Sequence, residues 1–105
     1  MSTHDVSVDE LAERLAAGAR LVDVREPDEF DEVRIAGSEL VPLRTVPEQV
    51  DRFRGDGPVF VMCRSGGRSM QACAYLDGLG VEAVNVEGGI LAWIASGRDV
   101  VTGSE

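Results

Sequence analysis

One short segment combines the residue types that enzymes use to activate a thiol. Cys63 opens it, and two arginines and two glycines follow within the next five positions. The arginines supply positive charge, while the glycines allow successive backbone N–H groups to turn inward toward an anion. Both effects favour the thiolate, which is the nucleophilic form of cysteine. We therefore predict a nucleophile and a small-anion site in the segment Cys63, Arg64, Ser65, Gly66, Gly67, Arg68 and Ser69.

The elements around this segment are predicted to place Cys63 at the edge of a sheet. Residues 59–62 are uniformly apolar, as in a buried strand. Apolar residues at helical spacing follow the segment and stop at Gly78 and Gly80. Cys63 would then lie between the carboxyl end of a strand and the N-terminus of a helix, where unpaired N–H groups attract negative charge. Ligands of open α/β sheets bind at this position.

The second cysteine, Cys73, is predicted to have a different role. It falls in the middle of the predicted helix between two alanines. This position favours structural packing, because inert buried thiols are common. The alternative is a resolving thiol for Cys63.

Several other chemistries lack the residues that they require. The chain has no lysine, which excludes Schiff-base catalysis. Its one histidine, His4, lies in a short polar N-terminus, so a Cys–His or Ser–His–Asp mechanism would have to recruit a residue from the chain end. Two cysteines without a CxxC pair indicate neither a disulfide scaffold nor a zinc site. We expect no metal and no cofactor.

The remaining patterns alternate between strands and helices. A capping box at Ser7 opens a helix that Gly18 ends, and a second box at residues 45–48 opens another. Alternation of this kind predicts an α/β fold with a mainly parallel sheet covered on both faces. We expect one domain over residues 1–105, with a core at about 7–101 and short polar termini. Further strands are predicted at residues 20–24, 39–43 and 83–86, a short helix at 27–32, and a last helix after Gly88-Gly89.

The charge distribution narrows the class of partner. The net charge is -9, which argues against nucleic acid or an anionic membrane as partner. Residues 57–76 nevertheless contain no acid and have a local charge of +2 from Arg64 and Arg68. The acidic run at residues 26–32 is interpreted as a solvated face. With no apolar run long enough for a membrane span and no leader-like start, we expect a soluble, cytoplasmic protein that receives a small anion at Cys63.

Three motifs, taken together, resemble the single-domain rhodanese family, whose members are thiosulfate sulfurtransferase-like proteins. They are residues 22–26 (Val-Asp-Val-Arg-Glu), the Cys63–Ser69 segment, and residues 88–93 (Gly-Gly-Ile-Leu-Ala-Trp). The resemblance covers residues 7–101 and implies a five-stranded parallel sheet with helices on both faces. It also implies that Asp23 and Arg25 form a buried structural pair. One departure is visible: residues 34–38 read Arg-Ile-Ala-Gly-Ser where such domains often have His-Ile-Pro-Gly-Ala, a segment that usually serves structure.

The resemblance further implies a mechanism in which Cys63 carries sulfur as a persulfide. The Cys63 thiolate would take the outer sulfur of thiosulfate and expel sulfite, and a thiol or cyanide would later collect that sulfur. Two arginines and two serines would hold the oxygens of the donor, and the loop N–H groups would stabilise the persulfide charge. A protein persulfide donor or a protein acceptor is an alternative to the small molecules. The donor-holding residues are Arg64, Ser65, Arg68 and Ser69, with the backbone of Gly66 and Gly67.

Two rival functions are left open by the residues. A binding or regulatory module could share the fold without turnover, because a fold does not by itself determine function. Phosphatases of the Cdc25 type and arsenate reductases use a related loop, but place one more residue between Cys and Arg than the four that separate Cys63 from Arg68. A shorter loop encloses a sulfur atom more readily than a phosphoryl group. The sulfurtransferase is therefore the favoured hypothesis.

Overall fold

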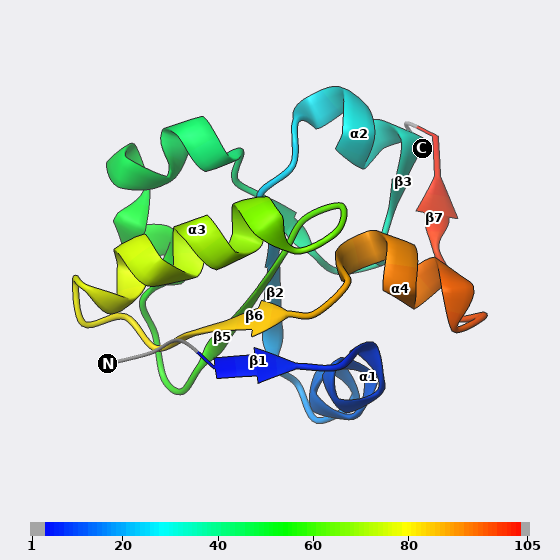
Figure 1. Cartoon of the computed structure of the whole chain (residues 1–105), viewed down its shortest axis with the longest axis horizontal. Coiled ribbons are helices and arrows are strands. Elements are labelled where there is room, and N and C mark those ends of the chain that lie inside the picture. Colours follow the sequence, from blue (N-terminus) through cyan, green and yellow to red (C-terminus); the bar gives the residue numbers. More distant parts are fainter. Residues whose placement is uncertain (1–3, 104–105) are drawn as a thin grey trace.

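Five parallel strands form the central sheet of the protein. A computed structural model describes residues 4–103 and places the strands in the order β1-β6-β5-β2-β4 (Figure 1). Every pairing in this sheet is parallel, as predicted. The middle strands β5 and β6 are buried along their whole length, which is typical of parallel sheets covered on both faces. The strands are β1 (His4–Val6), β2 (Arg20–Asp23), β4 (Glu39–Leu40), β5 (Val59–Met62) and β6 (Ala83–Val86).

Helices lie on both faces of this sheet, which confirms the predicted architecture. The first begins where expected, because Ser7 caps it and its hydroxyl oxygen accepts a hydrogen bond from the Glu10 N–H at 3.1 Å. A separate antiparallel pair of short strands joins the end of the chain to the segment after α2 (Figure 1). The helices are α1 (Val8–Ala16), α2 (Pro27–Glu32), α3 (Gly67–Asp77) and α4 (Gly89–Ala95), and the short pair is β3 (Val33–Arg34) with β7 (Val101–Thr102).

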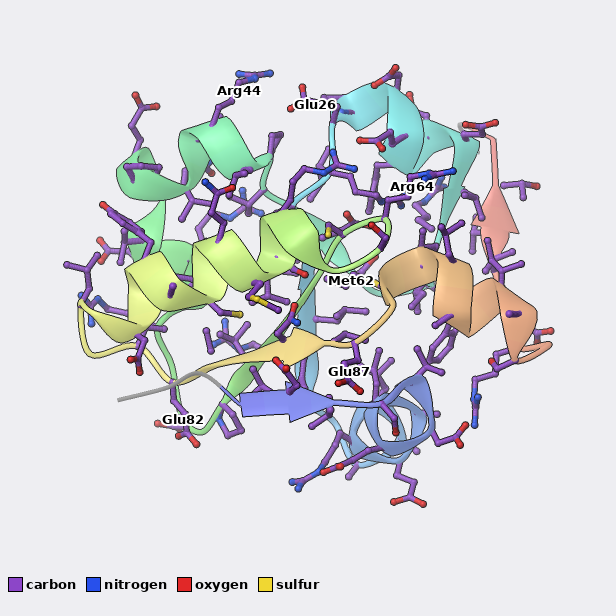
Figure 2. The ribbon with its side chains drawn as sticks, in the orientation of Figure 1. Glu26, Arg44, Met62, Arg64, Glu82 and Glu87 are labelled. Atoms are coloured by element: carbon purple, nitrogen blue, oxygen red, sulfur yellow. The ribbon has the colours of Figure 1, made fainter. Side chains whose placement is uncertain are left out.

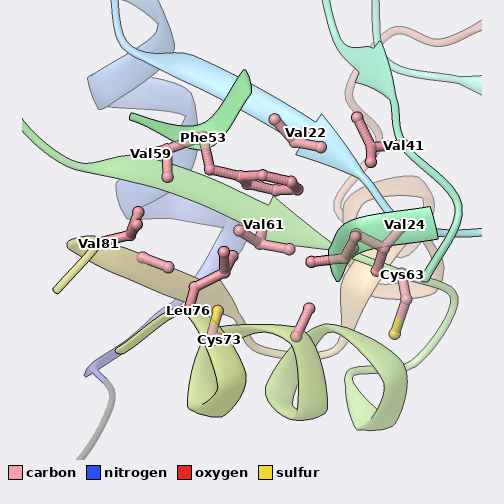
Figure 3. Packing of buried hydrophobic residues seen from close by; sticks show 13 residues of the cluster. Val22, Val24, Val41, Phe53, Val59, Val61, Cys63, Cys73, Leu76 and Val81 are labelled. Carbon is pink, nitrogen blue, oxygen red and sulfur yellow. The ribbon is translucent and has the colours of Figure 1, made fainter. Parts of the chain in front are cut away.

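Alternate side chains of the strands enter two separate apolar cores. On one face, Phe60 and Met62 pack with residues of α1 and α4, including Leu11 and Trp93. On the other face, Val59 and Val61 pack with Phe53 and with Leu76 of α3 (Figure 3). Because strand side chains alternate between faces, one strand joins the two layers into a single body. The layers hold the start of α3 against the end of β5, which is where Cys63 lies.

One sequence prediction needs correction at the N-terminal side of the fold. His4 does not lie in a loose polar terminus, because His4–Val6 forms the edge strand β1 and its register continues to Val84 and Phe60. The ordered fold therefore begins before residue 7. Three residues with one apolar side chain carry no strand pattern, and only pairing with β6 makes them a strand. Residues 1–3 and 104–105 of the predicted polar termini lie outside the described residues.

The predicted helix at the second capping box is also wrong. Two 3-10 helices occupy this region, η1 (Leu43–Glu48) and η2 (Val50–Phe53). The Thr45 hydroxyl donates to the Pro42 carbonyl at 2.8 Å and caps nothing. Pro47 lies inside η1 and has no N–H for an α-helical bond. The strand predicted at 39–43 is regular only over β4, although N–H groups of Val41 and Leu43 still bond to the end of β2.

The strand order changes direction beside Cys63. After β2 the chain moves to β4 at one edge, whereas after β5 it moves to β6 on the opposite side. The connections therefore diverge between the carboxyl ends of β2 and β5, which is the position where ligands of such sheets bind. Asp23 of β2 pairs in register with Met62 of β5, so the residues that follow each strand emerge together. In the part of the chain that the structure describes, no helix has the length and apolar character needed to span a membrane.

Candidate active site

The Cys63 sulfur lies inside a ring of hydrogen-bond donors. The backbone N–H of Gly66 donates to Sγ at 3.1 Å, and the N–H of Ser69 donates at 3.3 Å. The Ser69 hydroxyl lies 3.4 Å from the same sulfur. Cys63 is only 1% exposed, so these donors take the place of water around the sulfur. The predicted inward turn of the loop is therefore present, with Gly66 in the left-handed region at φ 118°.

This environment lowers the pKa of Cys63. Burial, the largest single effect, raises the pKa because it disfavours the charged thiolate. The hydrogen bonds from the Ser69 hydroxyl and from the N–H groups of Ser69, Gly66 and Ser65 outweigh burial and bring the net shift below the ordinary value of 9.0. The loop therefore favours a thiolate held at the N-terminus of α3, the arrangement of a reactive cysteine.

Helix α4 holds the loop from behind. The N–H groups of Ile90 and Leu91 donate to the carbonyls of Cys63 and Arg64 at 2.9 and 3.2 Å. The carbonyls of Cys63 and Arg64 therefore point toward α4, and the N–H groups of the loop can point toward the sulfur. Gly89 allows this close approach, because a Cβ there would lie 2.3 Å from the Cys63 carbonyl oxygen. The Gly88-Gly89 pair thus does more than begin a helix: it brings two chain segments into backbone contact.

Asn85 belongs to the site although the sequence analysis did not single it out. It lies on β6, is 1% exposed, and accepts a hydrogen bond at Oδ1 from the Ser69 hydroxyl at 2.5 Å. The same hydroxyl is within reach of the Gly66 carbonyl and of the Cys63 sulfur. Asn85 thereby positions Ser69 against the sulfur. A polar residue in an otherwise apolar buried strand, Ala-Val-Asn-Val, is the signal that could have revealed it.

Asp23 and Arg25 form a buried ion pair beside the loop. The Arg25 guanidinium donates to Asp23 Oδ2 at 2.8 Å, and both side chains are almost fully buried. Arg25 also donates to the backbone carbonyls of Glu29 and Val33. It therefore ties the end of β2 to the middle of α2 and to the residue that follows it, and neither Asp23 nor Arg25 contacts the Cys63 sulfur directly within the described hydrogen bonds. This geometry matches the structural pair that the family resemblance implies.

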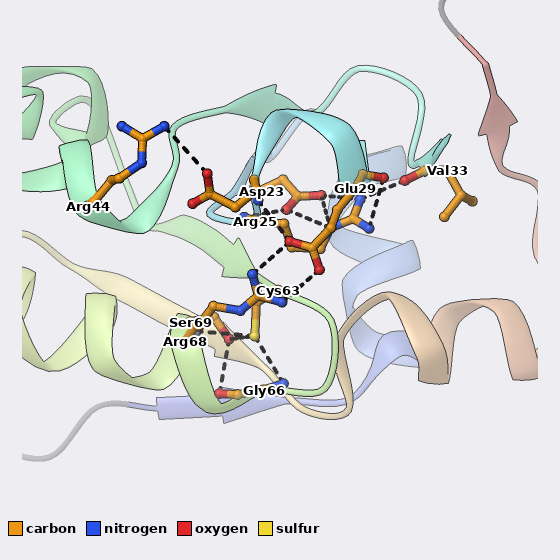
Figure 4. A network of polar contacts seen from close by, with 10 residues as sticks. Asp23, Arg25, Glu29, Val33, Arg44, Cys63, Gly66, Arg68 and Ser69 are labelled. Carbon is orange, nitrogen blue, oxygen red and sulfur yellow. Dashed lines mark hydrogen bonds and ion pairs between the residues drawn. The ribbon is translucent and has the colours of Figure 1, made fainter. Parts of the chain in front are cut away.

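Arg68 is already engaged by a carboxylate. Its guanidinium donates to the two carboxylate oxygens of Glu29 at 2.7 and 2.9 Å (Figure 4). The interpretation of residues 26–32 as a solvated acidic face is thus wrong for Glu29, which α2 carries into the site. The pair also reduces the local positive charge inferred from the sequence. An interaction between residues 39 positions apart has no local sequence signal.

The outer rim of the loop is exposed. Arg64 lies at the surface (Figure 2). Ser65 and Gly67 are also exposed, whereas Ser69 is fully buried. Within residues 4–103, the Arg64 guanidinium makes no hydrogen bond or ion pair with another side chain. Of the two arginines predicted to hold a donor, Arg64 is therefore the one whose charge is available at the surface.

The segment at residues 34–38 has a structural arrangement. Ile35 is buried in the core beside α1, and the Ser38 hydroxyl donates to the Ile35 carbonyl at 2.7 Å. The Arg34 guanidinium donates to the carbonyl of Gly103 at 2.7 Å, which joins the end of the chain to the segment after α2. The departure from the common family sequence thus falls in a segment that supports α2.

Comparison with known proteins gives a consistent result. The Rhodanese-like domain family model matches residues 7–96. The chain is 38% identical over 95 residues to "Putative sulfurtransferase YtwF" of Bacillus subtilis, covering 89% of this chain and 92% of the relative. It is 37% identical to a protein of Allochromatium vinosum named "Sulfurtransferase", covering 93% and 94% of the two chains. The crystal structure of a rhodanese-related protein from Thermoplasma volcanium is similar at a TM-score of 0.87 and 36% identity, covering 93% of this chain and 97% of that one.

Proposed function

Because the chain belongs to the Rhodanese-like domain family, we propose that it is a sulfurtransferase that carries a sulfane sulfur on Cys63. The observation that supports this most directly is the ring of donors around the sulfur, two N–H groups and a hydroxyl within 3.4 Å. Such a ring stabilises the charge of the Cys63 thiolate, and N–H groups of the same loop would stabilise the charge on the outer sulfur of a persulfide, one S–S bond beyond Sγ. A sulfur-transfer cycle needs both species.

The cycle consists of two displacements at sulfur. The Cys63 thiolate attacks the outer sulfur of the donor, a new S–S bond forms, and the donor's own bond to that sulfur breaks. The electron pair of the broken bond leaves with sulfite, if the donor is thiosulfate, or with a thiolate, if it is a persulfide. An acceptor thiolate or cyanide then attacks the outer sulfur and releases Cys63 as thiolate. Neither step requires a proton acceptor, an added oxidant or an added reductant.

The loop residues divide into two groups in this proposal. Ser69 and the N–H groups of Gly66 and Ser69 face the sulfur and hold the thiolate and the persulfide. Arg64 and Ser65 are exposed at the rim, where they meet the donor's anionic part. Arg68, with its Glu29 partner, borders the sulfur more closely. The family resemblance implies that Ser69 holds the donor's oxygens, but its burial and its hydrogen bonds favour a role on the cysteine side.

Mass spectrometry after incubation with thiosulfate tests the proposal. The wild-type protein is expected to gain the mass of one sulfur atom at Cys63 and to lose it when cyanide is added. Cys63→Ser should gain nothing, whereas the matched variant Cys73→Ser should behave as wild type. The proposal fails if neither thiosulfate nor a small alkyl persulfide loads the wild-type protein, or if Cys63→Ser is loaded equally well. Hydrolysis of a phosphotyrosine mimic without any sulfur loading would favour the phosphatase alternative, and neither activity would favour a binding module.

A further inference from the structure

The ion pair between Arg68 and Glu29 determines how much positive charge a donor meets near Cys63. Both nitrogens of the guanidinium fork contact the carboxylate, the geometry of a strong bidentate pair. The pair is partly buried, with side-chain exposures of 35% and 27%, so solvent screens it less than a pair in open water. The positive charge of Arg68, which the sequence predicts to stabilise the Cys63 thiolate together with that of Arg64, is thus neutralised by Glu29 of α2.

Further hydrogen bonds to the side chain and to the backbone carbonyl of Glu29 keep its carboxylate in place. Its Oε1 accepts the N–H of Glu26 at 2.9 Å in the capping box of α2. Its carbonyl oxygen accepts a hydrogen bond from Arg25, whose side chain is locked to Asp23. Hydrogen bonds from Arg68 lower the pKa of Glu29 to about 2, so the carboxylate is ionised throughout the physiological range.

Two other arginines of this network also have carboxylate partners. Arg25 pairs with Asp23 in the interior, and Arg44 makes a weaker, exposed contact with Glu26 at 3.4 Å (Figure 4). Arg64 is left as the one arginine of the neighbourhood without a carboxylate partner in the described structure. A thiolate at Cys63 cancels one positive charge. The site therefore offers little net attraction to a donor with two negative charges, because each added charge meets Glu29 as well as the thiolate.

Building on the proposed sulfur transfer, we propose that Glu29 is a specificity-determining residue that disfavours dianionic donors such as thiosulfate and favours carbon-bound persulfides of low charge. In such a donor, R–S–S⁻, the Cys63 thiolate attacks the outer sulfur and forms Cys63–S–S⁻. The S–S bond of the donor breaks, and its electron pair leaves with R–S⁻. The number of electrons is unchanged, and no oxyanion needs to be held by Arg68. Thiosulfate remains a substrate, but a poorer one than the sequence suggests.

Competitive alkylation of Cys63 tests this electrostatic role without requiring sulfur transfer. Iodoacetate is an anion and iodoacetamide is neutral, and both react with the same thiolate. The ratio of their rates at Cys63, followed by peptide mass spectrometry, therefore reports the local field and is independent of the thiolate fraction. The variant is Glu29→Gln, because glutamine also forms the capping box. The matched control is Glu32→Gln, which removes the same charge from an exposed position one turn further along α2.

Glu29→Gln is expected to raise the iodoacetate-to-iodoacetamide ratio by about fivefold, the order expected for one unit charge removed near a partly buried site. Glu32→Gln should change the ratio by less than about twofold, because exposed charges are screened. Equal changes in the two variants would overturn the proposal. If circular dichroism shows that Glu29→Gln is misfolded, Arg68→Gln is compared with the Arg68→Gln, Glu29→Gln double variant. The double variant must then have a higher iodoacetate-to-iodoacetamide ratio than Arg68→Gln alone, and equal ratios would overturn the proposal.

Sulfur loading provides the second measurement. We expect Glu29→Gln to raise kcat/KM for thiosulfate more than kcat/KM for the persulfide of 2-mercaptoethanol, which carries at most one negative charge. An equal change for both donors would contradict the assignment of Glu29 to donor charge. If the wild-type protein accepts sulfur from neither donor, the proposed function fails, while the alkylation ratio still decides whether Glu29 shapes the field at Cys63.

Discussion

Cys63 and Cys73 are two buried thiols beside the same helix with opposite properties. Cys63 lies at the N-terminus of α3 and Cys73 in its middle, well apart in the cluster (Figure 3). The exposed fractions are 1% and 0%, so burial does not distinguish them. Yet the pKa of Cys63 is lowered, whereas that of Cys73 is raised to about 12, chiefly by burial and then by the charges of Asp5, Asp77 and Cys63.

The difference shows what lowers the pKa of one buried cysteine and not that of the other. Burial raises the pKa at both positions, but only the sulfur of Cys63 accepts N–H groups from a loop and a helix start. Within α3 the N–H groups beyond the first turn are used by the helix itself, so none is available to Cys73. The structure thus favours the prediction that Cys73 packs the core over the alternative of a resolving thiol.

The largest effect is expected when the backbone contact between α4 and the Cys63 loop is disrupted. In Gly89→Ala, the new Cβ would lie 2.3 Å from the Cys63 carbonyl oxygen and 2.5 Å from that of Arg64. Since both are backbone atoms, we expect the free energy of unfolding to fall by about 3 kcal/mol or more. Denaturant unfolding measures this. Gly97→Ala is the control, because Gly97 also has a positive φ but no atom within 4 Å of its Cβ position. Equal losses would show that the loop contact is unimportant.

Serine substitutions should have unequal costs in stability at the two cysteines. Cys73→Ser puts a hydroxyl into an apolar environment and is expected to lower the free energy of unfolding by about 2 kcal/mol. Cys63→Ser should cost less than about 1 kcal/mol, because its hydroxyl oxygen can accept the hydrogen bonds that the sulfur accepts. Chemical unfolding of both variants under reducing conditions measures the difference. A larger loss in Cys63→Ser would contradict the comparison.

The raised pKa of Cys73 predicts a loss of stability in alkali. Above pH 9 the thiol ionises in the unfolded chain but not in the folded protein, so the folded state binds more protons and stability falls as pH rises. Between pH 9 and the folded pKa of about 12, this slope approaches about 1.4 kcal/mol per pH unit. Cys73→Ala should lack the slope. Cys63 contributes the opposite sign, since its lowered pKa makes the folded state gain stability as pH rises toward 9. Parallel curves for wild type and Cys73→Ala would contradict this assignment.

The smallest expected effect concerns one hydrogen bond. Ser69→Ala removes the hydroxyl that contacts the Cys63 sulfur at 3.4 Å and leaves the backbone N–H bonds in place. The pKa of Cys63 should rise, and the pH midpoint of its alkylation by iodoacetamide should move upward. Asn85→Ala should move the midpoint the other way, because the single Ser69 hydroxyl proton, no longer donated to Asn85 Oδ1, becomes available to the sulfur. A midpoint that stays constant in both variants would show that the N–H groups alone hold the thiolate.

Local patterns were sufficient to predict most of the elements. Apolar runs located β5 and β6, the Ser7 cap located α1, and the order strand–turn–helix located Cys63 at an N-terminus. Local patterns failed at β1, whose three residues become a strand only through pairing with β6. They also failed at η1, where Pro47 and the Thr45–Pro42 bond prevent the predicted helix.

The sequence by itself singled out Cys63 as the candidate nucleophile, because a thiol between a strand and a glycine-rich helix start depends on neighbours within seven positions. The tertiary structure alone decided what surrounds that thiol. Glu29, Asn85 and Gly89 reach the loop from α2, β6 and α4, so their contacts follow from the strand order and not from sequence spacing. The positive charge counted along residues 57–76 was therefore only part of the field, since a carboxylate 39 positions from Arg68 lies against it in the folded protein.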